Sequence, residues 1–167
     1  MIIKDYKIKE WREELRLLGK KLVVTNGCFD LLHVGHTSFL KEASALGDVL
    51  LVGCNSDRSV RELKGSSRPI NTQEDRVVVL SALRSVDAIS IYDEEDACNF
   101  LELAEPDIYV KGGDYSGNWE KKCPIATKER LIVEKSGGVV KLLSLIKGKS
   151  TTMLIDKITG QLNLQYL

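Results

Sequence analysis

The chain has 167 residues, and its 24 Lys and Arg residues balance 24 Asp and Glu residues. This length suits one domain with a sizeable core, so residues 1–167 are predicted to form a single domain. The balanced charge offers no basic patch for nucleic acid or an anionic membrane, and no apolar run approaches the roughly 20 residues of a membrane span. Because residues 1–5 also lack the apolar core of a signal peptide, we expect a cytoplasmic protein.

The first part of the sequence predicts a helix and then a strand–helix–strand unit. Helical spacing of apolar residues over 6–18 predicts a leading amphipathic helix within the segment 1–19. Its apolar positions are Ile8, Trp11, Leu15 and Leu18. The apolar runs at 22–26 and 49–54 predict buried strands, and 35–46 between them has the periodicity of a helix. Two parallel strands joined by a helix form a crossover, which is nearly always right-handed.

The rest of the sequence continues the alternation of helices and strands. The predicted elements are a helix ending near Leu63, a helix capped by Thr72, a strand at 88–91, a helix over 93–104, a strand at 108–110, a helix over 128–135, a strand at 139–143 and a helix over 153–158. Five strands alternating with helices predict an α/β fold with a doubly wound, Rossmann-like parallel sheet. The apolar tail 160–167 is predicted to add a strand or an interface segment.

A motif rich in glycine, histidine and other polar residues, at 25–36, lies between the first strand and the first crossover helix. It holds both histidines of the sequence, His33 and His36, with Gly35 between them. Helix starts of this kind bind anions, because unpaired N–H groups and the positive end of the helix dipole face the ligand. The alternative is that one histidine caps the helix and the other is buried in the core. We predict a phosphate site, with Gly35 leaving room for the phosphate and Cys28 packing behind the loop rather than acting as a nucleophile.

Four polar stretches are predicted to meet at one edge of the sheet. They are 26–36, 55–68, 111–115 and 147–152, and each follows a predicted strand. Open α/β sheets bind ligands at the carboxyl ends of their strands, where the strand order reverses. The convergence of these stretches therefore predicts the position of the site. No GxGxxG follows the first strand, which disfavours a dinucleotide dehydrogenase, and residues 116–126 are predicted to form a mobile, irregular loop.

The residue types in these stretches suit chemistry at the α-phosphorus of a nucleotide. An attacking phosphate oxygen is already ionised and leaving pyrophosphate needs no proton, so catalysis requires donors, cations and positioning. His33 and His36 can donate to phosphates. Lys64 and Arg68 lie in a loop with Gly65 that can close on the leaving group. Such a site needs no catalytic triad.

Several of these residues also have a structural interpretation. Lys64 and Arg68 can be ordinary surface charges, and Arg76 can pair with a neighbouring carboxylate. Residues 150–152 can simply cap the last helix, and Asp57 can cap the helix that it begins. The sequence leaves these alternatives open.

The segment 27–36 resembles the GxFDxxHxGH motif of the cytidylyltransferase-like nucleotidyltransferases. Further stretches resemble the adenylyltransferase domain of the ADP-heptose synthesis enzymes; they are 55–57, 64–69, 74–76 and 110–115. Residues 150–152 are similar to the Ser-Thr-Thr of the family's C-terminal motif. The resemblance spans about 20–160 in the family's order, without the heptose kinase domain that some members carry, so we expect a stand-alone adenylyltransferase.

This resemblance implies an HxGH nucleotidyltransferase fold and transfer of AMP from ATP to a heptose 1-phosphate. The products would be ADP-heptose and pyrophosphate, for lipopolysaccharide or another surface glycan. The resemblance also implies Mg²⁺ with ATP as co-substrate and a homodimer. The balanced charge and the lack of a long apolar run predict no nucleic-acid or membrane partner. The catalytic candidates are His33, His36, Lys64 and Arg68. The nucleotide-binding candidates are Asn26, Gly27, Cys28, Phe29, Gly35, Arg76, Lys111, Gly112, Gly113, Ser150, Thr151 and Thr152. The substrate-binding candidates are Asp30, Asn55, Asp57, Asp114 and Tyr115, and no metal ligand is assigned.

Other functions stay open at this point. A glycerol-3-phosphate cytidylyltransferase would carry RTEGIST before the last helix, and the stretch 145–151 lacks that arginine. An FAD synthetase-like adenylyltransferase is a second alternative, and a nucleotide-binding regulatory module is a third that needs no catalysis. A tRNA synthetase is disfavoured because the sequence has no KMSKS-like stretch.

Overall fold

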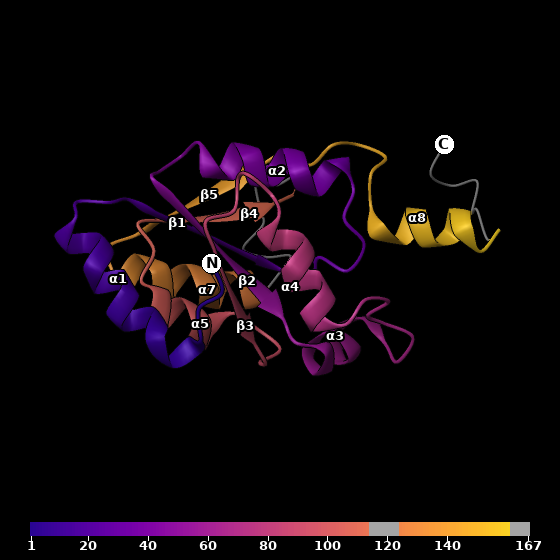
Figure 1. Ribbon diagram of the computed structural model, residues 1–167, viewed down its shortest axis with the longest axis horizontal. Helices are drawn as coiled ribbons and strands as arrows, with labels where there is room; N and C mark the ends of the chain where they lie inside the picture. Colours follow the sequence, from indigo (N-terminus) through magenta and orange to yellow (C-terminus); the bar gives the residue numbers. More distant parts are fainter. Residues whose placement is uncertain (114–123, 161–167) are drawn as a thin grey trace.

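The computed structural model describes residues 1–113 and 124–160 and contains a five-stranded parallel sheet (Figure 1). The strands are β1 Leu22–Gly27, β2 Val49–Asn55, β3 Ala88–Tyr92, β4 Ile108–Gly112 and β5 Val139–Leu143. Their order across the sheet is β3-β2-β1-β4-β5, so the order reverses between β1 and β4. The predicted doubly wound, Rossmann-like α/β fold is confirmed.

Helices cover both faces of the sheet (Figure 1). They are η1 Asp5–Lys7, α1 Ile8–Leu17, α2 Val34–Ser44, α3 Asp57–Lys64, α4 Gln73–Ser81, α5 Cys98–Ala104, α7 Pro124–Lys135 and α8 Thr151–Ile158. On one face, α1, α5 and α7 contribute Ile8, Phe100 and Val133 to a buried cluster. On the other face, α2 and α4 contribute Phe39 and Leu80 to a second cluster. The sheet is the shared wall of the two clusters.

Strand β1 shows why the apolar runs form central strands. Leu22 and Val24 pack in the cluster with α1, α5 and α7, while Val23 packs in the cluster with α2 and α4. Successive side chains of a strand point to opposite faces, and both faces are covered here, so all three residues are fully buried. Val23 stands level with Leu50 of β2 and Ile108 of β4. A continuous apolar run is therefore needed at this position.

The leading helix ends one residue earlier than predicted. Because α1 stops at Leu17, Leu18 lies at the C-terminal cap and is 71% exposed rather than packed on the sheet. Arg12 is buried instead: its Nε donates to the carbonyl of Glu105 and its Nη2 to the carboxylate of Asp107, both at 2.9 Å. Hydrogen bonds of this kind offset the cost of burying a charge, and helical spacing alone could not reveal them.

The helix predicted over 93–104 begins only at Cys98. Asp93 is held by the start of α3, because Nε of Arg58 donates to its carboxylate at 2.8 Å and the hydroxyl of Ser56 donates to it as well. These tertiary contacts hold Asp93 outside the helix, and the chain passes through bends at 94–97 before α5 begins.

Helix α7 begins at Pro124, before the predicted start at 128. Proline is favoured at the first helical position, because its missing N–H would have no partner there in any case. The predicted loop 116–126 therefore ends earlier than expected, and its residues 116–123 lie outside the part of the chain that the structure describes.

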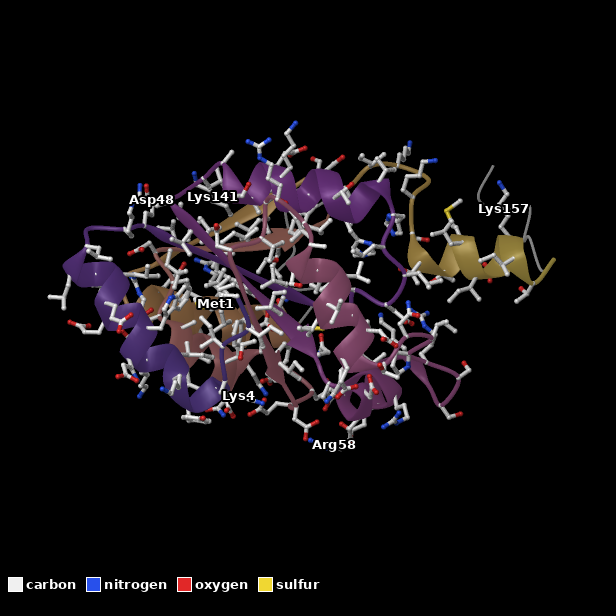
Figure 2. All side chains as sticks on the ribbon, in the orientation of Figure 1. Met1, Lys4, Asp48, Arg58, Lys141 and Lys157 are labelled. Atoms are coloured by element: carbon white, nitrogen blue, oxygen red, sulfur yellow. The ribbon has the colours of Figure 1, made fainter. Side chains whose placement is uncertain are left out.

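Helix α8 lies to one side of the sheet, apart from the other helices (Figure 1). None of its residues is buried, and Lys157 marks its far end, whereas Lys4 and Arg58 lie at the periphery of the main body (Figure 2). The predicted tail 160–167 falls outside the described residues from 161 onward. Within 1–113 and 124–160, no helix is both long enough and apolar enough to span a bilayer.

Candidate active site

A cavity of about 250 Å³ opens at the carboxyl ends of β1 and β4, where the strand order reverses. The loop after β1, the start of α2, the end of β4 and the start of α8 surround it. Its lining residues are Asn26, Gly27, Cys28, Phe29, His33, Gly35, His36, Phe39, Gly112, Leu145, Lys149, Ser150 and Thr151. Three of the four polar stretches expected here, 26–36, 111–115 and 147–152, contribute to this lining.

The loop after β1 turns sharply because of Phe29. Phe29 has a φ of 48°, in the left-handed region that costs a non-glycine residue conformational energy. Its side chain is buried in the cluster with α2 and α4, and this packing holds the strained backbone in place. A Cβ on Gly27 would lie 3.1 Å from the Phe29 ring, so the small residue gives the ring its space. The aromatic anchor turns the backbone of the loop toward the cavity.

His33 is both the cap of α2 and a member of the cavity wall. Its Nδ1 accepts a hydrogen bond from the N–H of Gly35 at 3.1 Å, so the neutral ring carries its proton on Nε2. A Cβ on Gly35 would lie 2.8 Å from Cε1 of His33. Gly35 therefore leaves room for the imidazole, where the sequence had suggested room for a phosphate. The Nε2–H is left as a donor for a ligand.

The ring of His36 lies next to that of His33, with a ring-centroid distance of 4.0 Å and an angle of 31° between the rings. The Phe29 ring is also near His36, 5.5 Å away between centroids and tilted by 57°. Burial, and then the neighbouring His33, lowers the pKa of His36 to about 4. Its buried Nδ1 has no hydrogen-bond partner among the described residues. Two neutral imidazoles thus stand side by side at the start of α2.

The low pKa of His36 predicts an acid-sensitive contribution to folding. An unfolded histidine titrates near 6.5, so between about pH 6.5 and 4 the unfolded chain binds a proton that the folded chain refuses. Stability should therefore fall as the pH drops through this window. We expect the urea midpoint of the wild-type protein to fall between pH 7.5 and 5, and to fall by more than the midpoint of the His36→Gln variant does. Parallel midpoints for the two proteins would contradict the assignment.

The start of α8 forms the opposite wall of the cavity. The hydroxyl of Ser150 caps the helix by accepting from the N–H of Met153 at 3.1 Å, and the hydroxyl of Thr151 donates to the Leu31 carbonyl at 3.3 Å. The second bond ties α8 to the motif at 25–36. Helix N-termini favour anions, so this wall suits phosphate oxygens. Thr152 is exposed and lies outside the lining.

Sequence reasoning missed three residues of the lining. Lys149 precedes the cap of α8, and a Cβ on Gly35 would lie 3.4 Å from Cβ of Lys149 as well as 2.8 Å from the His33 ring. Burial, and then the charge of Lys149, lowers the pKa of His33. Phe39 and Leu145 form an apolar wall, and Leu145 is so close that a Cβ on Gly112 would lie 2.6 Å from it. The sequence signal for Lys149 was its place beside the predicted cap at 150–152. No pattern marked the two apolar residues.

Asp30 and Arg68 pair with each other instead of facing the cavity. Nε of Arg68 donates to Asp30 at 2.5 Å, and the N–H groups of Ile70 and Asn71 donate to the same carboxylate at 2.8–2.9 Å. Although burial acts in the other direction, these bonds hold the pKa of Asp30 below its usual value. Asp30 was predicted to bind the second substrate and Arg68 to close on the leaving group; instead the two residues form an ion pair that holds the loop after α3.

Arg76 is 2% exposed and holds the loop after β1 from behind. Its guanidinium donates to the carbonyl of Cys28 at 2.5 Å and to the carboxylate of Asp57 at 2.8 Å, with further bonds to Asn71 and Cys54. Arg76 was predicted to bind nucleotide and Asp57 the second substrate. The structure places both outside the cavity lining, joined in an ion pair between α4 and α3.

Asn55 and Lys111 are also engaged within the protein. Asn55 is buried at the end of β2, and its amide donates to the hydroxyl of Ser59 at 2.9 Å. Nζ of Lys111 donates to the side-chain carbonyl of Asn26 at 3.0 Å and lies 2.8 Å from the carboxylate of Glu129. The structure therefore places Asn55 away from the cavity and Lys111 behind Asn26.

The remaining candidates lie at the margin of the site. Lys64 ends α3 and is exposed, but its charge reaches the loop after β1, where it partly offsets the burial that raises the pKa of Cys28. Gly113 follows β4 with a φ of 157°, and its N–H donates to the carbonyl of Leu143 at 3.1 Å. Asp114 and Tyr115 lie outside the described residues.

Comparison with known proteins identifies the family. The model of the cytidylyltransferase-like family matches residues 24–157, which is more than half of the chain. The chain belongs to the cytidylyltransferase-like family. This confirms the resemblance drawn from the segment 27–36, and with it the class of nucleotidyltransferase.

Similar proteins extend the comparison. The bifunctional protein HldE of Wolinella succinogenes is 47% identical over 152 residues, which is 91% of this chain and 29% of that protein. HldE of Campylobacter fetus is also 47% identical, over 85% of this chain and 29% of that protein. The chain thus spans about 29% of the length of these relatives. A lipopolysaccharide core biosynthesis protein from Thermoplasma volcanium has the same fold, with a TM-score of 0.59, 29% identity and coverage of 77% of this chain and 98% of that one.

Proposed function

We propose that the protein transfers AMP from ATP to a heptose 1-phosphate, giving ADP-heptose and pyrophosphate. The observation that carries this proposal is the pair of neutral imidazoles, His33 and His36, at the start of α2 in a cavity at the sheet's switch point. Both rings stand at a helix N-terminus, where phosphate groups bind favourably.

The reaction needs one bond to form and one to break at the α-phosphorus of ATP. An oxygen of the sugar 1-phosphate attacks, the bond from the α-phosphorus to the oxygen that bridges to the β-phosphate breaks, and pyrophosphate leaves with that electron pair. The attacking oxygen is already ionised, so no residue has to remove a proton. The protein contributes alignment of the reactants and stabilisation of the charge that moves onto pyrophosphate.

The geometry suggests a role for each wall of the cavity. The Nε2–H of His33 donates to a phosphate oxygen, and His36 stabilises the charge that develops beside it. The ammonium of Lys149 and the N-terminus of α8 at Ser150 and Thr151 hold the phosphates from the opposite side. Lys64 lies at the exposed C-terminal end of α3, from which its ammonium can approach the leaving pyrophosphate.

Mg²⁺ is proposed to enter with ATP, held by phosphate oxygens, because this ion usually binds through substrate phosphates rather than an all-protein cage. Within the described residues, no group of three or more His, Cys, Asp or Glu residues forms a metal site. The carboxylate of Asp30, which lies in the motif after β1, is already paired with Arg68. The described residues do not fit a protein-held ion, and no step is assigned to one.

The sugar substrate is supported by the stretches that resemble the ADP-heptose synthesis enzymes and by the fold shared with a lipopolysaccharide core biosynthesis protein. The decisive experiment measures pyrophosphate release with four nucleotides and a panel of sugar and polyol phosphates. We expect the highest kcat/KM with ATP and D-glycero-β-D-manno-heptose 1-phosphate. Turnover with CTP and glycerol 3-phosphate, or with ATP and FMN, would assign one of the alternative transferases. No turnover with any pair, despite nucleotide binding, would indicate a regulatory module.

ATP is expected to raise the melting temperature more than CTP at equal concentration. A ligand that binds only the folded state stabilises it according to its concentration relative to Kd, so the larger shift identifies the preferred base. Differential scanning fluorimetry with 1 mM of each nucleotide would measure the two shifts. A larger shift with CTP would move the protein toward the cytidylyltransferases.

We propose a cytoplasmic homodimer formed along the β5 edge. The β3 edge is covered by the N-terminal segment, since the N–H of Ile3 donates to the Ile89 carbonyl at 2.8 Å. Exposed apolar side chains gather instead on β5 and the segment after it; they are Val139, Leu142, Leu145 and Ile146. Light scattering at micromolar concentration is expected to give the mass of two chains. The mass of one chain, or a dimer that persists in Val139→Lys, would count against this interface.

A further inference from the structure

Glu129 is a buried carboxylate that the mechanism above does not use. It lies on α7, on the face that packs against the sheet, and is 1% exposed. One oxygen, Oε1, accepts from the N–H of Ala97 at 3.2 Å, just before α5. The other, Oε2, accepts from the hydroxyl of Tyr109 at 2.9 Å and from Nζ of Lys111 at 2.8 Å. Both of these partners come from β4, which ends at the cavity.

Tyr109 and Lys111 carry the contact onward to Asn26, at the end of β1. The hydroxyl of Tyr109 is 2.6 Å from Oδ1 of Asn26, and Nζ of Lys111 donates to the same Oδ1 at 3.0 Å. On its other side, Nδ2 of Asn26 donates to the hydroxyl of Tyr92 at 2.7 Å. Asn26 is therefore held on both sides while it lines the cavity.

The orientation of the Asn26 amide follows from this arrangement. Lysine can only donate hydrogen bonds, so the atom of Asn26 that faces Lys111 has to be the oxygen, and the amino group has to face Tyr92. Lys111 itself is held in place by the carboxylate of Glu129. The hydroxyl of Tyr109 has a single proton to share between Oδ1 of Asn26 and Oε2 of Glu129. Burial, and then the charge of Glu129, raises the pKa of Tyr109, so this proton stays on the ring oxygen.

Loss of the negative charge at 129 would disturb all of these contacts together. Lys111 would keep only a neutral acceptor, in a region where its side chain is 23% exposed, and it would be drawn toward solvent. Asn26 would lose the donor that distinguishes its oxygen from its nitrogen. The amide at the cavity wall would then be free to flip, although none of the groups that touch the cavity had been changed.

We propose that Glu129 is a positioning residue for the nucleotide, which acts through Lys111 and Tyr109 to fix the amide of Asn26 at the cavity wall. The inference rests on the proposed function in one respect, namely that the cavity binds ATP. It assigns to α7 a part in nucleotide binding, although that helix supplies none of the described residues that line the cavity.

The test is a double-mutant cycle on ATP binding, measured by calorimetry with Mg²⁺ present. Glu129→Gln is expected to weaken ATP binding roughly tenfold, because residues in one hydrogen-bond network couple by this order of magnitude. In an Asn26→Ala background the same substitution is expected to change Kd less than twofold. A purely structural role for Glu129 would weaken binding equally in both backgrounds, and this outcome would overturn the inference.

The control is Glu134→Gln on the same helix, which removes an exposed carboxylate paired with Arg130 and should leave ATP affinity unchanged. Glu129→Asp keeps the charge beside Lys111, so it carries the same cycle if Glu129→Gln does not fold, with a smaller expected loss. Steady-state kinetics should show a higher KM for ATP and an unchanged KM for the sugar phosphate. Unchanged ATP affinity in Glu129→Gln would refute the inference alone, whereas no ATP binding by the unchanged protein would refute the proposed function as well.

Discussion

Replacing His36 by glutamine, or His33 by asparagine, is expected to lower kcat about 10²- to 10³-fold. A preorganised donor that stabilises transition-state charge contributes about 3–4 kcal/mol, and each imidazole is assigned this role. The choice of residues separates chemistry from folding. Asparagine is a good helix cap, so His33→Asn can still accept from the N–H of Gly35 while it lacks the Nε2–H donor. Pyrophosphate release under saturating substrates measures the effect.

Thr37→Ala is the matched control for the histidine variants. Thr37 follows His36 on α2, but its exposed hydroxyl donates only within the helix, to the carbonyl of Val34 at 3.1 Å. Its kcat should stay within twofold of the unchanged protein. Melting temperatures of all the variants would show whether the fold is intact. A folded His36→Gln that turns over at the full rate would remove the central claim about the site.

Arg76→Met is expected to cost about 3–5 kcal/mol of the free energy of unfolding, as is typical when a buried charged group that satisfies several partners is removed. The substitution leaves the Cys28 and Asn71 carbonyls without their donor and leaves Asp57 without its counter-charge. Because a domain of this size is stable by only about 5–15 kcal/mol, the urea midpoint should fall by a large fraction. The loop after β1 would also lose its support, so kcat should fall as well.

Arg58→Ala provides the comparison for the Arg76 experiment. Arg58 makes ion pairs too, with Asp93 at 2.7 Å and Glu62 at 2.9 Å, but it is exposed on α3. Ion pairs in water contribute little, so the urea midpoint should hardly move. An equal fall of the urea midpoint in the two variants would show that Arg76 contributes no more to stability than an exposed ion pair does. It would then have no special part in supporting the loop.

The sequence was sufficient to place the sheet and the position of the cavity. The apolar runs that became β1 and β2 are continuous because both faces of these strands are covered, and a continuous run is a strong local signal. The histidine pair sits directly after β1, so the general rule for open sheets located the cavity once the strands were known. These inferences depend on residues close together in the chain.

The hydrogen-bond partners of the arginines proposed for the phosphate site could not be predicted from the sequence. Arg68 meets Asp30 across 38 positions, and Arg76 meets the Cys28 carbonyl across 48. A cation near a predicted phosphate site can bind the ligand or hold the loop that binds it, and the residue type is the same in both cases. Only the three-dimensional contacts show that these two arginines hold loops. Lys149 is a different case, because it does line the cavity but was not predicted to do so. The hydroxyl residues that follow it in the sequence were assigned the phosphate contact, and no role was assigned to the cation.

The contact between Gly27 and the Phe29 ring has an evolutionary consequence. A Cβ at position 27 would approach this ring to 3.1 Å, so the cost of any larger residue there depends on what occupies position 29. Gly27→Ala should lower the stability of the protein more when position 29 is phenylalanine than when it is a smaller residue such as leucine. The two positions are thus epistatic, and related sequences are expected to change them together. A library that randomises this loop should vary 27 and 29 as one unit.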